Sequence, residues 1–173
     1  TNTIFINEFL ASNSFNIEDR DFDQNSDWLE LYNADESAID ISNWFITDNL
    51  DRPNKWKIPE GTIIQSGEYL IFWADNKDTS IIEFHTSFAL SQDGEEIGLF
   101  DSDTNLVDSI IFPQQSVDIS YGRKPDGGKN WYYFDTPTPG DSNSQSVFNK
   151  LDPPLFSVDA GFYNTSQVLE ISS

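Results

Sequence analysis

The sequence predicts an all-β protein built as an antiparallel β-sandwich, and three observations lead to that fold class. Short segments alternate apolar and polar residues, and turn signals separate them roughly every eight to twelve residues. No segment keeps a helical period of about 3.6 residues over several turns. The chain also contains 14 Phe, 5 Trp and 6 Tyr, which are too many aromatic residues for a disordered acidic chain.

Two early segments carry the clearest strand signals. Asp27–Asn33 alternates along its length, so we expect Leu29 and Leu31 on one face and Glu30, between two aromatic residues, on the other. Thr3–Leu10 shows the same period. A regular strand there would place Ile4, Ile6, Glu8 and Leu10 on one face and Phe5, Asn7 and Phe9 on the other.

The remaining strands are shorter and lie between turns rich in Gly, Pro, Asn and Asp. The expected strands are Ile39–Ile41, Trp44–Thr47, Lys55–Ile58 as an edge strand, Thr62–Ile64, Tyr69–Ala74, the hairpin Glu96–Phe100 with Leu106–Phe112, and the hairpin Ile119–Gly122 with Trp131–Phe134. Ala11–Ser26 and Asp75–Ser80 are expected loops, and Ile81–Leu90 has no clear pattern. Because Thr136–Ser146 reads as a domain end, we predict a sandwich domain over residues 1–146 and a linker with a second β module over 147–173.

Charge and composition exclude several classes of function. The chain has 9 basic and 30 acidic residues, a net charge of −21, which argues against binding nucleic acid or anionic lipid. No apolar run approaches the roughly 18 residues of a membrane span, so no membrane insertion is expected. The chain has no Cys, which removes disulfides and thiolate chemistry, and the lack of Met in a chain starting at Thr1 suggests a mature or excised form.

A set of motifs between Thr3 and Asn143 resembles the lamin-tail domain, in its secreted bacterial branch. The matching stretches are Ile6–Asn13, Asp27–Asn33, Ile41–Trp44, Ile58–Thr62, Gly67–Leu70, Trp73–Asp75, His85–Ser91, Gly94–Glu96, Val107–Ile110, Ser120–Arg123 and Pro137–Gly140. The resemblance implies an immunoglobulin-like sandwich without catalytic activity. It also implies an interaction or targeting module of a secreted or cell-surface multidomain bacterial protein, with a protein or glycan partner outside the cell.

The tail resembles the opening of a different module. Pro154–Ser157, Gly161–Tyr163 and Val168–Ile171 are similar to the start of a chitobiase C-terminal-like module. The resemblance implies that residues 147–173 open a second β domain.

One acidic loop has the spacing of a calcium-binding loop. Asp19, Asp21, Asp23, Asp27 and Glu30 occupy positions 1, 3, 5, 9 and 12 of that register. Gln24 stands where the motif needs Gly, and no helix flanks the loop. A bound Ca²⁺ and a solvated loop therefore both remain open, with no other cofactor implied. Asp101–Asn105 is a second acidic stretch that a hairpin turn explains equally well.

Three further patterns bear on function. Glu8 and Glu30 form a pair of strand carboxylates that a two-carboxylate hydrolase would need, but strand acids more often accept hydrogen bonds from loop N–H groups or from an arginine such as Arg123. His85, the single histidine, is expected to be satisfied by its neighbours. A carbohydrate-binding module is the main alternative function, with Trp56 and Trp131 as the tryptophans expected to be exposed for ligand binding.

Overall fold

The computed structural model describes residues 3–148, 155–158, 161–166 and 168–172 of the chain. These residues form strands and loops and contain no helix. The all-β prediction is confirmed.

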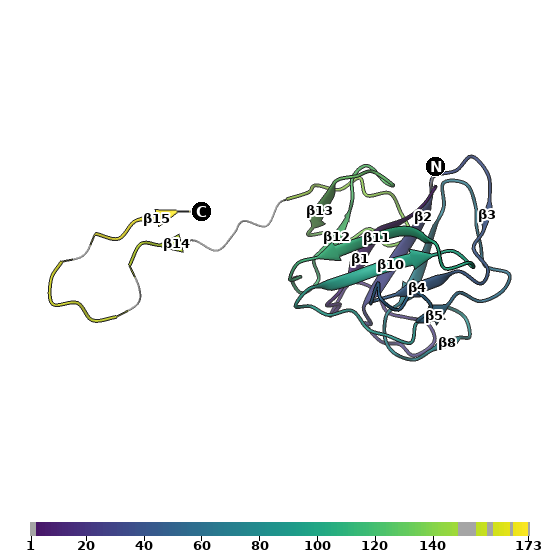
Figure 1. Ribbon diagram of the computed structural model, residues 1–173, viewed down its shortest axis with the longest axis horizontal. Helices are drawn as coiled ribbons and strands as arrows, with labels where there is room; N and C mark the ends of the chain where they lie inside the picture. Colours follow the sequence, from purple (N-terminus) through teal and green to yellow (C-terminus); the bar gives the residue numbers. More distant parts are fainter. Residues whose placement is uncertain (1–2, 149–154, 159–160, 167, 173) are drawn as a thin grey trace.

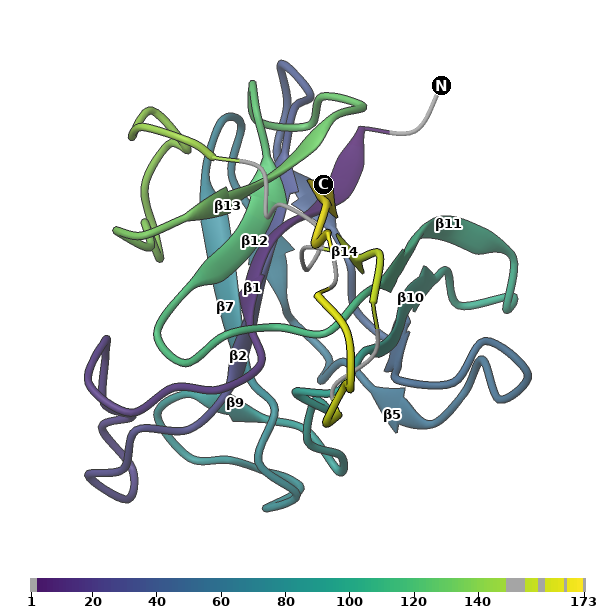
Figure 2. The same cartoon turned by 90° about the vertical axis from the view of Figure 1, so that its left-hand side faces the viewer.

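Two sheets face each other as layers, which the view in Figure 2 separates. The larger sheet has seven strands in the order β13 (Trp131–Phe134), β12 (Ser120–Arg123), β1 (Ile4–Leu10), β2 (Trp28–Asn33), β7 (Tyr69–Trp73), β9 (Phe84–His85) and β8 (Thr79–Ser80). The smaller sheet has four, in the order β11 (Leu106–Phe112), β10 (Glu95–Phe100), β4 (Phe45–Thr47) and β5 (Trp56–Lys57). A two-stranded sheet, β3 (Ile39–Asp40) with β6 (Ile63–Ile64), adds to the sandwich.

The hydrophobic core lies between the two layers. Its buried members from the larger sheet are Ile4, Ile6, Phe9, Leu29, Leu31 and Phe72, and those from the smaller sheet are Ile46, Trp56, Ile97, Leu99 and Phe112. A second, smaller cluster of Leu10, Trp28 and Trp73 lies apart from this core. The outer face of the larger sheet therefore also buries apolar surface, under the loop that follows β1, since Ile17 packs against this cluster.

The predicted facing of β2 is confirmed, whereas that of β1 is wrong. A β-bulge between Ile6 and Glu8 shifts the register of β1 against β2. Beyond the bulge the faces exchange, so Phe9 joins Ile4 and Ile6 in the core and Leu10 joins the outer cluster. An extra residue in the strand explains this, because simple alternation cannot continue through it.

The region that lacked a clear pattern contains two short strands. Thr79–Ser80, expected in a loop, forms β8, and Phe84–His85 forms β9. β9 pairs with β7 in parallel, whereas the other strand pairs in the larger sheet are antiparallel. The sheet is therefore mixed at this edge. Both predicted hairpins, β10–β11 and β12–β13, are present.

The chain after the sandwich is described in part. Phe148 still forms a bridge with Tyr133 of β13, and β14 (Leu155–Phe156) pairs only with β15 (Ile171–Ser172) among the described strands. Figure 1 shows this pair well apart from the sandwich. Residues 149–154, 159–160, 167 and 173 of the predicted linker and second module lie outside the described residues. The domain boundary stays a prediction. Within the described chain, a search for a helix with the length and apolarity to cross a membrane found none.

Candidate functional site

The two strand carboxylates meet on the outer face of the larger sheet. Glu8 of β1 and Glu30 of β2 are cross-strand partners, and both are fully buried. Leu29 and Leu31 point into the core, so Glu30, between them on the strand, points to the other face. Two acids thus lie side by side without exposure to solvent.

The segment after β13 covers this pair and donates hydrogen bonds to it. The backbone N–H of Thr138 donates to Glu8 Oε1 at 3.1 Å, and the backbone N–H of Gly140 donates to Glu30 Oε2 at 2.5 Å. Ser120 Oγ donates a short hydrogen bond to Glu8 Oε1, and Asn7 Nδ2 donates to Glu30 Oε1 at 3.2 Å. The expectation that these acids accept bonds from loop N–H groups is confirmed.

Burial raises the pKa of both carboxyls above its ordinary value. For Glu8, desolvation outweighs the hydrogen bonds from Ser120 and Thr138, which act in the opposite direction. For Glu30, desolvation again dominates the raised pKa, and the neighbouring Glu8 charge adds to it. Two adjacent carboxylates repel each other when both are charged and buried, so a proton on one of them lowers the free energy of the folded state.

The hydroxyl of Thr138 gives a geometric reason for a proton on Glu8. Thr138 Oγ1 lies 2.8 Å from Glu8 Oε2 and 2.7 Å from Asn143 Oδ1, and it has one hydrogen to donate. The Asn143 amide orientation is fixed by its Nδ2, which donates to Arg123 O at 2.8 Å. If Thr138 donates to Asn143 Oδ1, then a protonated Glu8 can donate to Thr138 Oγ1. Each of these three oxygens then has a hydrogen-bond partner.

Gly122 lets the network close. A Cβ atom at Gly122 would lie 2.8 Å from Asn143 Nδ2, 3.0 Å from Glu8 Cγ and 3.1 Å from the backbone oxygen of Asn7. These distances are shorter than ordinary van der Waals contacts. Only glycine therefore allows β12 to approach Glu8 while Asn143 bridges over it.

Asp126 anchors the same covering segment from the β12–β13 turn. Its carboxylate accepts hydrogen bonds from Asn7 Nδ2 at 3.0 Å, Ser142 Oγ at 2.6 Å and the Asn143 N–H at 3.0 Å. Burial works to raise the pKa of Asp126, but these hydrogen bonds outweigh it and hold the pKa below its ordinary value. The hydrogen bonds therefore favour the charged form of Asp126.

Arg123 does not contact the strand acids, which corrects one expectation. Its Nη2 lies 2.9 Å and 3.0 Å from the two carboxylate oxygens of Asp108 in β11, and its Nε donates to Ile6 O at 2.8 Å. Asp108 Oδ2 also accepts the Ile6 N–H at 2.8 Å. This buried ion pair links the smaller sheet to β1 at its bulge.

The five proposed calcium ligands are not brought together. Glu30 faces Glu8, as described above, and Asp19 is buried against the N–H of Phe22 at 2.6 Å. Asp27 accepts the Asn13 N–H at 3.0 Å, and burial raises the pKa of Asp27 to about 6. Asp23 is exposed. Among the described residues no group of three or more acids or histidines is arranged to hold a metal ion.

Asp21 and His85 instead connect the loop after β1 to β9. His85 is fully buried, with Nδ1 at 2.8 Å from Asp75 Oδ2 and Nε2 at 3.3 Å from Asp21 Oδ2. Asp21 also accepts the N–H groups of Ile82 and Glu83. Burial opposes ionisation of Asp21, yet these hydrogen bonds hold its pKa below the ordinary value. The expectation that its neighbours satisfy His85 is confirmed.

Of the two tryptophans proposed for ligand binding, Trp56 lies inside the sandwich and Trp131 packs partly buried against it. Trp56 is 5 % exposed and belongs to the core, so its expected exposure is wrong. Trp131 is half-buried, stacks on Tyr121 with ring centroids 5.4 Å apart, and lies 4.7 Å from the Arg123 guanidinium carbon. Neighbouring side chains therefore occupy the surfaces that a sugar platform would need.

The second acidic stretch forms a turn. Asp101 Oδ1 accepts the N–H groups of Asp103 at 2.9 Å and Asn105 at 2.8 Å, and Asn105 Nδ2 donates to Asp101 Oδ2 at 2.9 Å. These bonds, the one from the Asn105 side chain above all, lower the pKa of Asp101. Of the two explanations left open, the hairpin turn is the one that the geometry supports.

Sequence reasoning missed the groups that complete the network around Glu8 and Glu30. Thr138 and Asn143 stood in a segment interpreted only as a domain end, and Asp126 stood in a turn. The sequence held one signal for them. The strand acids needed N–H partners, and Pro137–Gly140 belongs to the same set of motifs as both acids.

Comparison with known proteins bears on the part of this arrangement that the first 113 residues supply. The family model of the lamin tail domain matches residues 1–113, which contain Glu8, Glu30 and Asp108. A search of curated proteins found no match.

Proposed function

Because the chain belongs to the lamin tail domain family, we propose that it is a non-catalytic interaction module. The observation that carries this proposal is the use of the two paired strand carboxylates. Glu8 and Glu30 are buried under the segment after β13, and their oxygens accept hydrogen bonds from Ser120, Thr138 and Gly140. A glycosidase needs such a pair open to substrate and water.

The setting of the module is part of the same proposal. We place it in a secreted or cell-surface multidomain bacterial protein, with a protein or glycan partner outside the cell and no nucleic acid. The resemblance of its motifs to the secreted bacterial branch supports the location, and the net charge of −21 supports the exclusion of a phosphate backbone. Cell fractionation of the producing organism tests the location, and recovery in the cytosol alone would contradict it.

A hydrolase panel tests the absence of catalysis. The native chain and the variants Glu8→Gln and Glu30→Gln are assayed on chromogenic glycosides, phosphate esters and carboxylic esters. We expect rates at the level of the buffer for all three proteins. The proposal would be overturned if the native chain showed turnover and both variants lost it while thermal melts showed them still folded. That result would favour a two-carboxylate hydrolase.

A further inference from the structure

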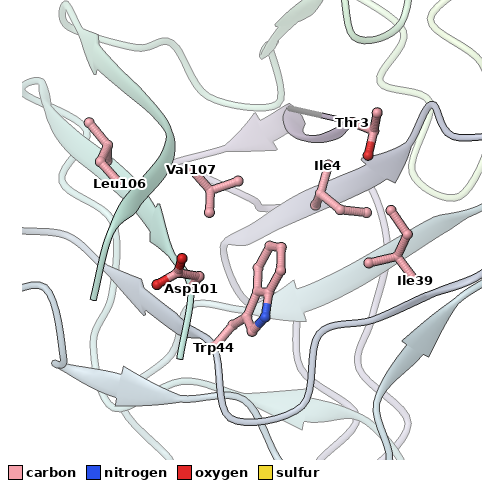
Figure 3. A pocket seen from close by; sticks show the side chains of 7 residues that line it. All are labelled: Thr3, Ile4, Ile39, Trp44, Asp101, Leu106 and Val107. Carbon is pink, nitrogen blue, oxygen red and sulfur yellow. The ribbon is translucent and has the colours of Figure 1, made fainter. Parts of the chain in front are cut away.

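A pocket opens where one end of β1 meets β3 and the β10–β11 turn. It has a volume of about 380 Å³ and is lined by Thr3, Ile4, Ile39, Trp44, Asp101, Leu106 and Val107. Figure 3 shows the Trp44 indole standing at the centre of this group, with Asp101 on one side and Ile39 on the other. The pocket therefore combines aliphatic walls, an indole and one carboxylate.

The chemistry of the lining limits what can occupy it. Asp101 is the single charged residue of the lining, and the Thr3 hydroxyl and the Trp44 indole N–H are its other polar side-chain groups. A sugar needs several donors and acceptors around its hydroxyl groups, more than these three side chains supply. A purely apolar occupant would take the Asp101 carboxylate out of water without a compensating charge, which costs free energy.

An amphipathic cation avoids both problems. The stem of a lysine or arginine side chain buries apolar surface against groups such as Ile39 and Leu106. Its charged head can lie beside the Asp101 carboxylate and near the Trp44 ring, where a cation is attracted to the π system. The net charge of −21 on the chain also draws a basic partner towards this surface.

We propose that this pocket, called here the Trp44 pocket, binds a lysine or arginine side chain of a basic protein partner. The inference rests on the proposed function, because it names the chemistry by which the interaction module recognises its partner. The pocket shares no lining residue with the Glu8–Glu30 network. Its ligand can therefore be tested without altering that network.

The ionised state of Asp101 supports the proposal independently of the pocket shape. Its carboxylate is held by the Asn105 side chain and by two backbone N–H groups of the turn. These bonds favour the charged form and lower its pKa. A negative charge is thus available at the pocket wall at neutral pH.

The test uses n-pentylammonium chloride as the probe and 1-pentanol as its neutral counterpart. Both are titrated into the full ¹⁵N-labelled chain at constant ionic strength, and the resonances of the Trp44 indole and the Leu106 amide are followed. We expect saturable shifts with pentylammonium in the millimolar range and weaker, non-saturating shifts with pentanol. Equal affinities for the two probes, or no saturable shift with pentylammonium, would overturn the proposal.

Two variants make the test specific. Asp101→Asn removes the charge but keeps an oxygen that can accept the turn N–H groups, and we expect it to weaken pentylammonium binding about fivefold or more. Ile111→Ser alters another exposed apolar residue of β11, outside the pocket, and should leave binding unchanged. Unchanged affinity in a folded Asp101→Asn variant, or saturable binding of chitotriose at the same resonances, would contradict the proposal. A failure here leaves the hydrolase panel unaffected, so the two proposals can fail separately.

Discussion

Two acidic regions of this molecule were candidate sites in the sequence, and the fold uses them in opposite ways. The strand acids Glu8 and Glu30 converge in one buried network under the segment after β13. The acids of the loop after β1 diverge, because Asp21 accepts a hydrogen bond from the Glu83 N–H between β8 and β9, whereas Asp27 accepts one from the Asn13 N–H. A strand fixes the direction of every side chain, whereas loop spacing alone does not. Convergence of acids is therefore predictable only where a strand is regular, and in β1 the bulge is what turns Glu8 to the face of Glu30.

The largest expected effect comes from removing a strand acid. Glu8→Ala leaves the Thr138 N–H and the Ser120 hydroxyl without their acceptor in a buried site. We expect the free energy of unfolding to fall by about 3 kcal/mol, the sum of two unsatisfied groups and a small cavity. Urea denaturation measures the change. A loss below about 0.5 kcal/mol, the range of ordinary surface changes, would mean that the network does not hold the segment.

Gly122→Ala tests the same network by crowding it. The new methyl group would lie 2.8 Å from Asn143 Nδ2 and 3.1 Å from the Asn7 backbone oxygen. We expect a loss of about 2 kcal/mol, typical of overpacking in a closed site. Gly61→Ala is a useful comparison, because its Cβ meets no atom within 4 Å but its φ is +82°. Gly122 has no positive φ, so Gly61→Ala shows the size of backbone strain alone, and an unchanged denaturation midpoint in Gly122→Ala would contradict the crowding.

Of the acids in the loop after β1, we expect Asp21 to contribute to stability and Asp23 not to. Asp21→Asn removes the charge and one of the two oxygens that accept from the Ile82 and Glu83 N–H groups and lie beside His85, so we expect a lower melting temperature. Asp23 is exposed and has a φ of 53°, a conformation that asparagine tolerates. Asp23→Asn should therefore stay within about 0.5 kcal/mol of the native chain in thermal melts. Equal losses in the two variants would show that the loop acids act as a set.

Asp27 lies where the loop meets β2 and gives a pH-dependent prediction. Burial raises its pKa to about 6, so the folded chain binds a proton that the unfolded chain has already released. Its contribution is complete below about pH 4 and is lost as the pH rises through about 6. Asp27→Asn keeps an acceptor for Asn13 and should flatten the fall in unfolding free energy over that interval. Identical pH profiles for the native chain and the variant would contradict the raised pKa.

Calcium should have the smallest effect. The calcium-loop hypothesis predicts stabilisation of about 2.7 kcal/mol at one hundred times the dissociation constant. With Glu30 facing Glu8 and Asp27 facing Asn13, the described geometry predicts a melting temperature that does not change on adding millimolar calcium or EDTA. A calcium-dependent rise that Asp21→Asn abolishes would show that the loop rearranges to hold the ion.

The sequence was sufficient for the parts of the fold that depend on local pattern. It predicted the β-sandwich, the facing of β2 and both hairpins, because alternation and turn residues act over a few positions. It could not predict the bulge in β1, since Asn7 fits a regular strand equally well by composition. The consequence was an incorrect face for Phe9.

Only the acceptors of the candidate site could be predicted from the sequence, and their donors could not. The sequence indicated that buried strand acids need N–H donors, and Glu8 and Glu30 have them. The donors lie more than 100 residues away in the chain, at Thr138 and Gly140, and a contact over that distance depends on the complete fold. The predicted exposure of Trp56 was wrong for the same reason, because the core that covers this side chain is built from strands far along the chain.

Hydrogen exchange at Gly140 tests the central claim most directly, namely that the strand acids hold the covering segment and perform no chemistry. The Gly140 N–H donates to Glu30 Oε2. In Glu30→Ala we expect this amide to exchange at least about tenfold faster than in the native chain, which corresponds to about 1.4 kcal/mol of lost protection. In Asp21→Asn its exchange should not change. Native protection of Gly140 in a folded Glu30→Ala variant would contradict the structural role of the acid pair.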